Sequence, residues 1–134
     1  MRSLFDVEAM GRGVLGDQWK TASAPQRNEF ADVMFEQISR SLIRRIGPRP
    51  EALEFLGERK IGAEILASSR LTIGAIVVNL DWRLRGSRVV DVLIDGRSVM
   101  ASRREDYNSR LAANGNSIAA LTASLREDLI RTAN

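Results

Sequence analysis

Residues 73–85, with the sequence IGAIVVNLDWRLR, decide the fold class of this chain. Apolar side chains occupy every second position between residues 76 and 84. They are Ile76, Val78, Leu80, Trp82 and Leu84. Because successive side chains of a strand point to opposite faces, this spacing predicts a β-strand over 73–85 with one apolar face.

Three further strands are predicted around this one. Residues 88–94 follow after a tight turn at Arg85-Gly86-Ser87 and end at Asp95-Gly96. Residues 51–56 and 60–68 have a weaker period-two pattern. The central part of the chain is therefore expected to form a sheet.

The strand at 88–94 has apolar residues on both faces. One face is expected to hold Val90, Val92 and Ile94. Val89 and Leu93 fall on the other face, which indicates a strand covered on both sides. Asp91 shares that second face, so we expect it to be partly buried beside an arginine, in a structural role. Asp81 is expected to point away from the core.

Helices are predicted before and after the strands along the sequence. The helix at 24–45 begins with Ser23 and Gln26 at capping-box spacing and ends before Gly47. Its apolar stripe contains Phe30, Val33, Met34, Ile38 and Leu42. Residues 5–19 indicate short helices interrupted by glycines, and residues 99–113 a helix closed by Asn114-Gly115. A last helix starts at Asn116 or Ser117.

The order of helices, then strands, then helices is typical of an α+β fold. With 134 residues the chain suits a single domain, residues 1–134, built on one core. We expect a twisted, curved and mostly antiparallel sheet packed against several helices.

The chain has no histidine and no cysteine. Catalytic triads and Cys-His pairs need these residues, as do the usual zinc ligand sets. No tight group of Asp, Glu, Lys or Tyr takes their place in the sequence. The prediction is therefore no catalytic residue, no metal and no cofactor.

The positive charge is almost entirely arginine, because Lys20 and Lys60 are the only lysines in a chain of net charge +3. The guanidinium group of arginine binds phosphate well, and the phosphate could belong to a nucleic acid or to an anionic lipid surface. The pairs Arg44-Arg45 and Arg103-Arg104 are too short for a nucleic-acid patch, and only Tyr107 lies near one as a stacking platform. A solvated surface is the simpler interpretation, and no nucleic-acid partner is predicted.

Three stretches, taken in order, resemble one protein family. The first is LFDVEAM at 4–10 with VLGDQWK at 14–20, the second is APQRNEF at 24–30, and the third is VDVLIDGRSV at 90–99. This combination resembles the MlaC family of toluene-tolerance, periplasmic phospholipid-binding proteins, including its hopanoid-associated branch. Arg97 departs from the pattern, which usually has an apolar residue there.

The resemblance implies a non-catalytic periplasmic carrier. Such a protein takes phospholipid between an outer-membrane lipoprotein complex and an inner-membrane ABC transporter complex, with acyl chains in an apolar pocket between sheet and helices. The residues expected to line that pocket are Trp19, Phe30, Met34, Ile38, Ile76, Val78, Leu80, Trp82, Val90, Val92 and Ile94. Arginines at its mouth are expected to meet the phosphate.

The start of the chain departs from the family. Residues 1–10 contain Asp6 and Glu8 and no long apolar run, so no signal peptide is predicted. The family's N-terminal helices and signal peptide are expected to be missing. Their loss should expose apolar surface and favour a homo-oligomer of the shortened form.

Two other classes of function stay open at this point. A nucleic-acid or surface-binding module would show arginines clustered on one face and salt-sensitive binding. A small cone-shaped α+β enzyme or small-molecule module would need a polar pocket with inward-facing Asp or Tyr side chains. The orientation of Asp81 and Asp91 separates this alternative from the lipid carrier.

Overall fold

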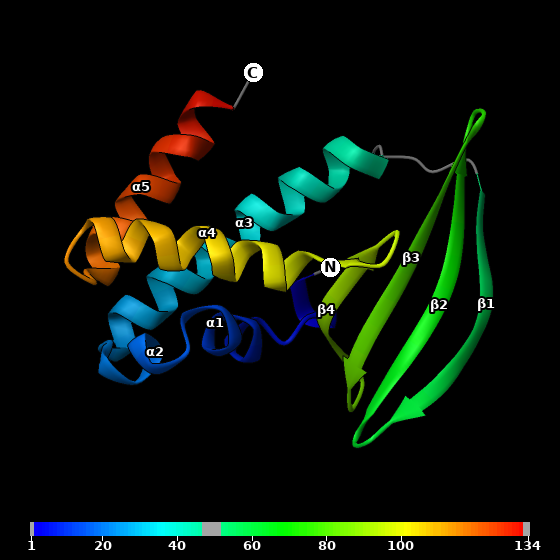
Figure 1. Ribbon diagram of the computed structural model, residues 1–134, viewed down its shortest axis with the longest axis horizontal. Coiled ribbons are helices and arrows are strands. Elements are labelled where there is room, and N and C mark those ends of the chain that lie inside the picture. Colours follow the sequence, from blue (N-terminus) through cyan, green and yellow to red (C-terminus); the bar gives the residue numbers. More distant parts are fainter. Residues whose placement is uncertain (1, 47–51, 133–134) are drawn as a thin grey trace.

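A curved five-stranded sheet stands beside a group of helices (Figure 1). The computed structural model describes residues 2–46 and 52–132. The strands follow one another in the order β1-β2-β3-β4-β5, and every neighbouring pair is antiparallel. This arrangement confirms the predicted α+β class and the antiparallel sheet.

The strands are β1 (Ala52–Ile61), β2 (Glu64–Ile73), β3 (Ile76–Arg85), β4 (Arg88–Ile94) and β5 (Arg97–Ser98). The predicted bounds of β4 are confirmed, and residue 51 lies outside the described residues. The prediction that β3 begins at residue 73 is wrong, because Gly74 takes a positive φ of 58° in a turn that ends β2. Gly62, with φ 62°, likewise separates β1 from β2 and leaves Lys60 in β1.

The helices are α1 (Val7–Leu15), α2 (Asp17–Thr21), α3 (Ala24–Ile46), α4 (Val99–Ala113) and α5 (Ile118–Arg131), after a short 3-10 turn η1 (Arg2–Leu4). The predicted capping box is present. The Gln26 N–H donates to Ser23 Oγ at 3.3 Å, and the Ser23 N–H donates to Gln26 Oε1 at 2.9 Å. Ser117, one of the two predicted caps, accepts from the Ala120 N–H and starts α5.

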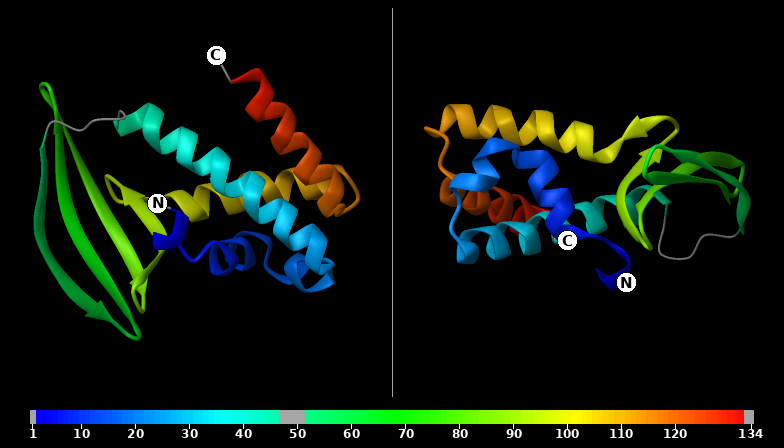
Figure 2. Two further views of the ribbon diagram at one scale, coloured as in Figure 1. Left: turned by 180° about the vertical axis from the view of Figure 1, so that it is seen from behind. Right: turned by 90° about the horizontal axis from the view of Figure 1, so that it is seen from below.

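The helices contact the sheet mainly through β4. α3 packs against α1 and α5, while β4 contacts α1 and α4. β1, β2 and β3 make their contacts chiefly with neighbouring strands, and both views of Figure 2 show β1 on the side of the sheet farthest from the helices. The sheet therefore curls away from the helices from β4 to β1.

The core lies among the helices and against β4. Tyr107 of α4 is fully buried, meets Phe30 edge to face with ring centroids 5.7 Å apart, and donates its hydroxyl to Gln37 Oε1 at 2.8 Å. Burial raises the pKa of Tyr107 above its ordinary value. No helix in the described part of the chain is both long and apolar enough to cross a membrane.

Candidate functional site

One face of the sheet is a continuous apolar wall. The register places Ile65 opposite Leu84, Ala67 opposite Trp82, Ser69 opposite Leu80 and Leu71 opposite Val78. Side chains at directly opposed positions share a face. Leu71 and Leu80 belong to the main core, and Val78, Trp82 and Leu84 pack against it, so this is the face turned toward the helices.

Ser69 is the one polar side chain at these paired positions, and it is 4% exposed. Its hydroxyl donates to the Leu80 carbonyl at 2.7 Å and accepts from the Trp82 indole N–H at 3.1 Å. The Ser69 hydroxyl and the Trp82 indole N–H therefore satisfy each other within the β2–β3 pair. An apolar ligand can lie on this face without covering an unpaired donor.

The apolar wall continues onto side chains that no helix covers. Leu53 and Phe55 of β1 lie opposite Leu71 and Ser69 in the register, and they are 57% and 65% exposed. Ile76, opposite Ile73, is 64% exposed. Large apolar side chains gathered on one exposed face are typical of a surface that binds an apolar partner.

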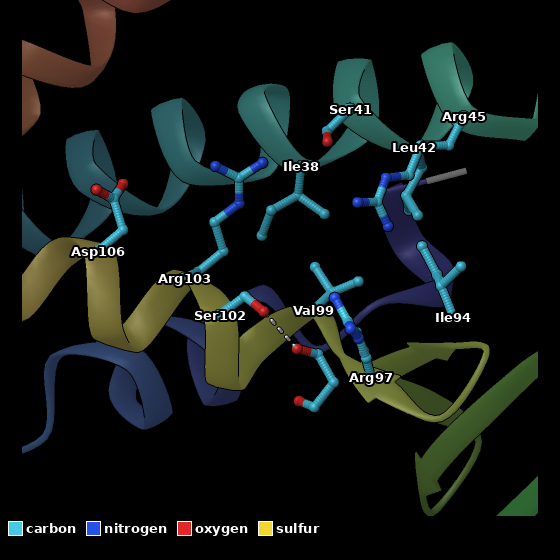
Figure 3. Close-up of a pocket in the computed structure, with 11 residues that line it drawn as sticks. Ile38, Ser41, Leu42, Arg45, Ile94, Arg97, Val99, Ser102, Arg103 and Asp106 are labelled. Carbon is cyan, nitrogen blue, oxygen red and sulfur yellow. Dashed lines mark hydrogen bonds between the residues drawn. The ribbon is translucent and has the colours of Figure 1, made fainter.

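A cavity of about 230 Å³ adjoins this wall where α3, α4, β4 and β5 meet. Figure 3 shows Ile38 and Leu42 of α3 on one side of it and Val99 of α4 on the other. Ile94 also lines the cavity and lies opposite Leu80 in the register, so the cavity and the wall share a border.

Three arginines surround this cavity, one from each of three elements. Arg45 comes from the end of α3, Arg97 from β5 and Arg103 from α4. Within residues 2–46 and 52–132, no carboxylate forms an ion pair with any of the three. Asp106, which also lines the cavity, pairs with Arg110, whose Nε lies 3.2 Å from its Oδ1. The cavity is therefore lined by four apolar side chains, by three serines and Asp106, and by three arginines that have no carboxylate partner among the described residues.

Comparisons with known proteins identify the family and the fold of the chain. The family model described as MlaC protein matches residues 1–127. The chain belongs to the MlaC family. A solved structure of a phospholipid-binding protein from Ralstonia solanacearum, in complex with a phospholipid, is similar with a TM-score of 0.88. At 17% identity, over 100% of this chain and 78% of that chain, the likeness shows a shared fold. No curated protein matches this chain.

The MlaC fold gathers most of the residues predicted to bind lipid. Leu80, Val92 and Ile94 are buried on the apolar wall, and Val78 and Trp82 are half-buried there. The three predicted residues of α3 are buried as well. They are Phe30, Met34 and Ile38. Of these, Ile38 lines the cavity, whereas Phe30 packs against Tyr107 inside the helical layer.

Trp19 lies elsewhere in this MlaC-family chain. Its ring packs on Gly11 of α1, at a point where a Cβ on Gly11 would come 2.6 Å from Trp19 Cζ3. The Arg27 guanidinium stands 5.5 Å from the centre of the Trp19 ring. Trp19 therefore joins α1, α2 and α3, and the structure does not bring it to the wall.

The prediction that Val90 shares a face with Val92 and Ile94 is wrong. The register pairs Leu84 with Val89 and then Arg83 with Asp91, which leaves Val90 as the extra residue of a β-bulge. Val89 takes its place in the main core, and Val90 lines a separate cavity beside Met10 and Met100.

Asp81 and Asp91 both point away from the apolar wall. Asp81 lies opposite Ser68 and Leu93, on the other face of the sheet. Asp91 is 2% exposed and accepts from the Val92 N–H at 2.8 Å, the Met100 N–H at 3.1 Å and the Ser98 hydroxyl at 2.5 Å. Its carboxylate ties β4 to the start of α4, the structural role expected for it. Neither aspartate supplies the inward-facing acid that the enzyme alternative needs.

Sequence reasoning missed Ser69 and left the arginines of the cavity unidentified. Ser69 sits in the period-two row of Ile65, Ala67 and Leu71, but only the register with β3 brings it to Trp82. The three arginines are 52 and 6 positions apart in the chain. Only the packing of α3 against α4 and β5 brings them to one cavity.

Proposed function

We propose that this MlaC-family protein is a non-catalytic lipid carrier that holds acyl chains of a phospholipid or related lipid against the apolar face of β1–β4. The observation that supports this most strongly is the exposure of Leu53, Phe55 and Ile76 on a face whose polar groups in β2 and β3 are already paired. In the proposal, the ligand covers these side chains.

The energetics of the wall suit hydrocarbon. Each methylene group moved from water to an apolar surface contributes about 0.8 kcal/mol, so an acyl chain gains several kcal/mol by covering the wall. Unpaired polar groups would offset this gain, and Ser69 and Trp82 avoid that cost by binding each other.

The 230 Å³ cavity alone is smaller than the roughly 300–1,000 Å³ of typical small-molecule sites. We therefore place only part of the lipid in it, and the rest of the acyl chains along the exposed wall toward β1. Arg45, Arg97 and Arg103 then stand where they can donate to the phosphate oxygens, as forked, charged donors suited to that group.

Membership of the MlaC family supports a place for this carrier in the periplasm. In the proposal, it moves lipid between an outer-membrane lipoprotein complex and an inner-membrane ABC transporter complex. The fold shared with the phospholipid-binding protein from Ralstonia solanacearum supports the lipid-binding part of this proposal.

Native mass spectrometry of the gently purified full chain tests the proposal. We expect a bound phospholipid or related lipid, and we expect the emptied chain to take lipid up again from vesicles. A chain that is purified empty and remains empty after incubation with vesicles would refute the carrier.

Two adjacent residues of β3 provide a matched pair of variants for the same measurement. Ile76 is 64% exposed on the apolar wall, and Val77 is 53% exposed on the opposite face, across from Thr72. Ile76→Asp should lower lipid occupancy severalfold because it places a charge on the wall, whereas Val77→Asp should leave occupancy unchanged. Equal losses in both variants would contradict the placement of the ligand.

A further inference from the structure

A second cavity lies next to the one at the apolar wall. It has a volume of about 350 Å³ and lies between α3, α4 and α5. Ser41 and Arg103 line both cavities. In Figure 3 the Arg103 side chain extends from α4 toward α3. The two cavities therefore form one polar region at the end of the wall.

Positive charge dominates this region. Six arginines line the two cavities, namely Arg44, Arg45, Arg97, Arg103, Arg110 and Arg131. Two carboxylates accompany them, and both are already engaged with arginine. Asp106 pairs with Arg110, and Asp128 pairs with Arg110, through Nη2 at 2.7 Å, and with Arg131.

These partners suit one class of headgroup and not another. An ammonium headgroup needs a carboxylate or an aromatic face, and no described residue lining either cavity is aromatic. Nucleic-acid bases also need aromatic platforms, so a single-stranded nucleic acid is a poor fit. Anionic headgroups need donors and positive charge, and the free arginines supply both.

We infer that the protein selects lipids whose headgroup has a net negative charge, such as phosphatidylglycerol, over zwitterionic lipids such as phosphatidylethanolamine. This inference rests on the proposed carrier function and names the class of lipid it takes. Arg97 and Arg103 act as the residues that determine this specificity, because they line the cavity at the apolar wall and have no carboxylate partner among the described residues.

Competitive loading tests the inference with the full chain. The emptied protein is incubated with vesicles that contain equal amounts of phosphatidylglycerol and phosphatidylethanolamine with identical acyl chains, and the bound lipids are then extracted and quantified. We expect phosphatidylglycerol to exceed phosphatidylethanolamine about fivefold or more, the discrimination that one good hydrogen bond provides.

Variants of the arginines that line the cavity test whether these residues cause the headgroup preference. Arg97→Gln and the double variant Arg97→Gln/Arg103→Gln should move the bound ratio toward that of the vesicles while keeping total lipid per protein. The matched control is Arg70→Gln/Arg88→Gln, because both arginines are exposed and line neither cavity. The control should keep the preference of the unmodified chain.

Each other outcome overturns the inference in a recognisable way. Equal amounts of the two lipids on the unmodified protein overturn the headgroup preference and leave the carrier function intact, whereas a chain that takes up no lipid overturns both. A preference that persists in the double variant removes Arg97 and Arg103 from the explanation and overturns the inference. If the double variant slows uptake of both lipids and keeps their ratio, the arginines bind the membrane surface and do not select the headgroup.

A soluble competitor separates a lipid headgroup from a free phosphate compound as the natural ligand. Glycerol phosphate in large excess should leave the bound lipid in place, because the acyl chains provide most of the binding energy. Displacement of the lipid by glycerol phosphate would assign the arginines to a soluble phosphate and overturn the inference.

Discussion

The indole N–H of Trp82 donates to the hydroxyl of Ser69 at 3.1 Å, across the β2–β3 pair and within an otherwise apolar face of the sheet. The Ser69 hydroxyl in turn donates to the Leu80 carbonyl. Because the two groups are hydrogen-bonded to each other, neither is left unpaired where hydrocarbon is proposed to lie.

Ser69→Ala should destabilise the fold by about 1–3 kcal/mol, because it leaves the N–H of the half-buried Trp82 without a partner. The free energy of unfolding in urea measures this. Ser69→Ala/Trp82→Phe removes donor and acceptor together, so its loss should be smaller than the sum of the two single losses. Strictly additive losses would contradict a hydrogen bond between the two side chains.

Tyr107 should make the protein lose stability at high pH. Burial raises its pKa in the folded state, so above pH 10 the unfolded chain releases the phenolic proton while the folded chain keeps it. The contribution of Tyr107 to the stability of the fold is therefore complete below about pH 10 and decreases as the pH rises further.

Absorbance of tyrosinate checks this directly, because Tyr107 is the only tyrosine in the chain. The native protein should show no tyrosinate at pH values near 10, and the signal should appear together with unfolding. In Tyr107→Phe the decrease of stability above pH 10 should largely disappear. Ordinary titration of the tyrosine in the folded protein would show that it is open to solvent.

Two glycines of α1 should respond oppositely to alanine. A Cβ on Gly11 would come within 2.6 Å of the Trp19 ring, so Gly11→Ala should cost about 1–3 kcal/mol. Gly13 has no atom within 4 Å of such a Cβ, and Gly13→Ala should stabilise the helix by about 0.5–1 kcal/mol. Thermal unfolding of both variants measures this, and a shift of the same sign in both would contradict the packing of Trp19 on α1.

Sequence reasoning predicted the elements whose ends are marked locally. β4 lies between Gly86 and Asp95-Gly96, and α4 begins after Ser98 and ends before Asn114, so their bounds follow from turn and cap residues. Gly74 marks a turn as well, but apolar residues lie on both sides of it, and the predicted strand at 73–85 therefore included the turn.

Features that depend on pairing between elements could not be predicted in this way. Nothing within β4 marks Val90 as the bulged residue, because the bulge exists only relative to β3. The exposure of Phe55 likewise results from the position of β1 at the free edge of the curved sheet. The apolar spacing predicted the wall residues of β3 and, apart from Val90, those of β4, and the tertiary structure decides which wall residues stay uncovered.

The central claim is that an acyl chain lies against Trp82 on the sheet. Quenching of tryptophan fluorescence by a lipid with brominated acyl chains measures this contact, because bromine quenches only at short range. Trp19→Phe leaves Trp82 as the only tryptophan, and Trp82→Phe leaves Trp19. We expect the bound brominated lipid to quench Trp82 strongly and Trp19 weakly. Bound lipid that leaves Trp82 unquenched would contradict the account.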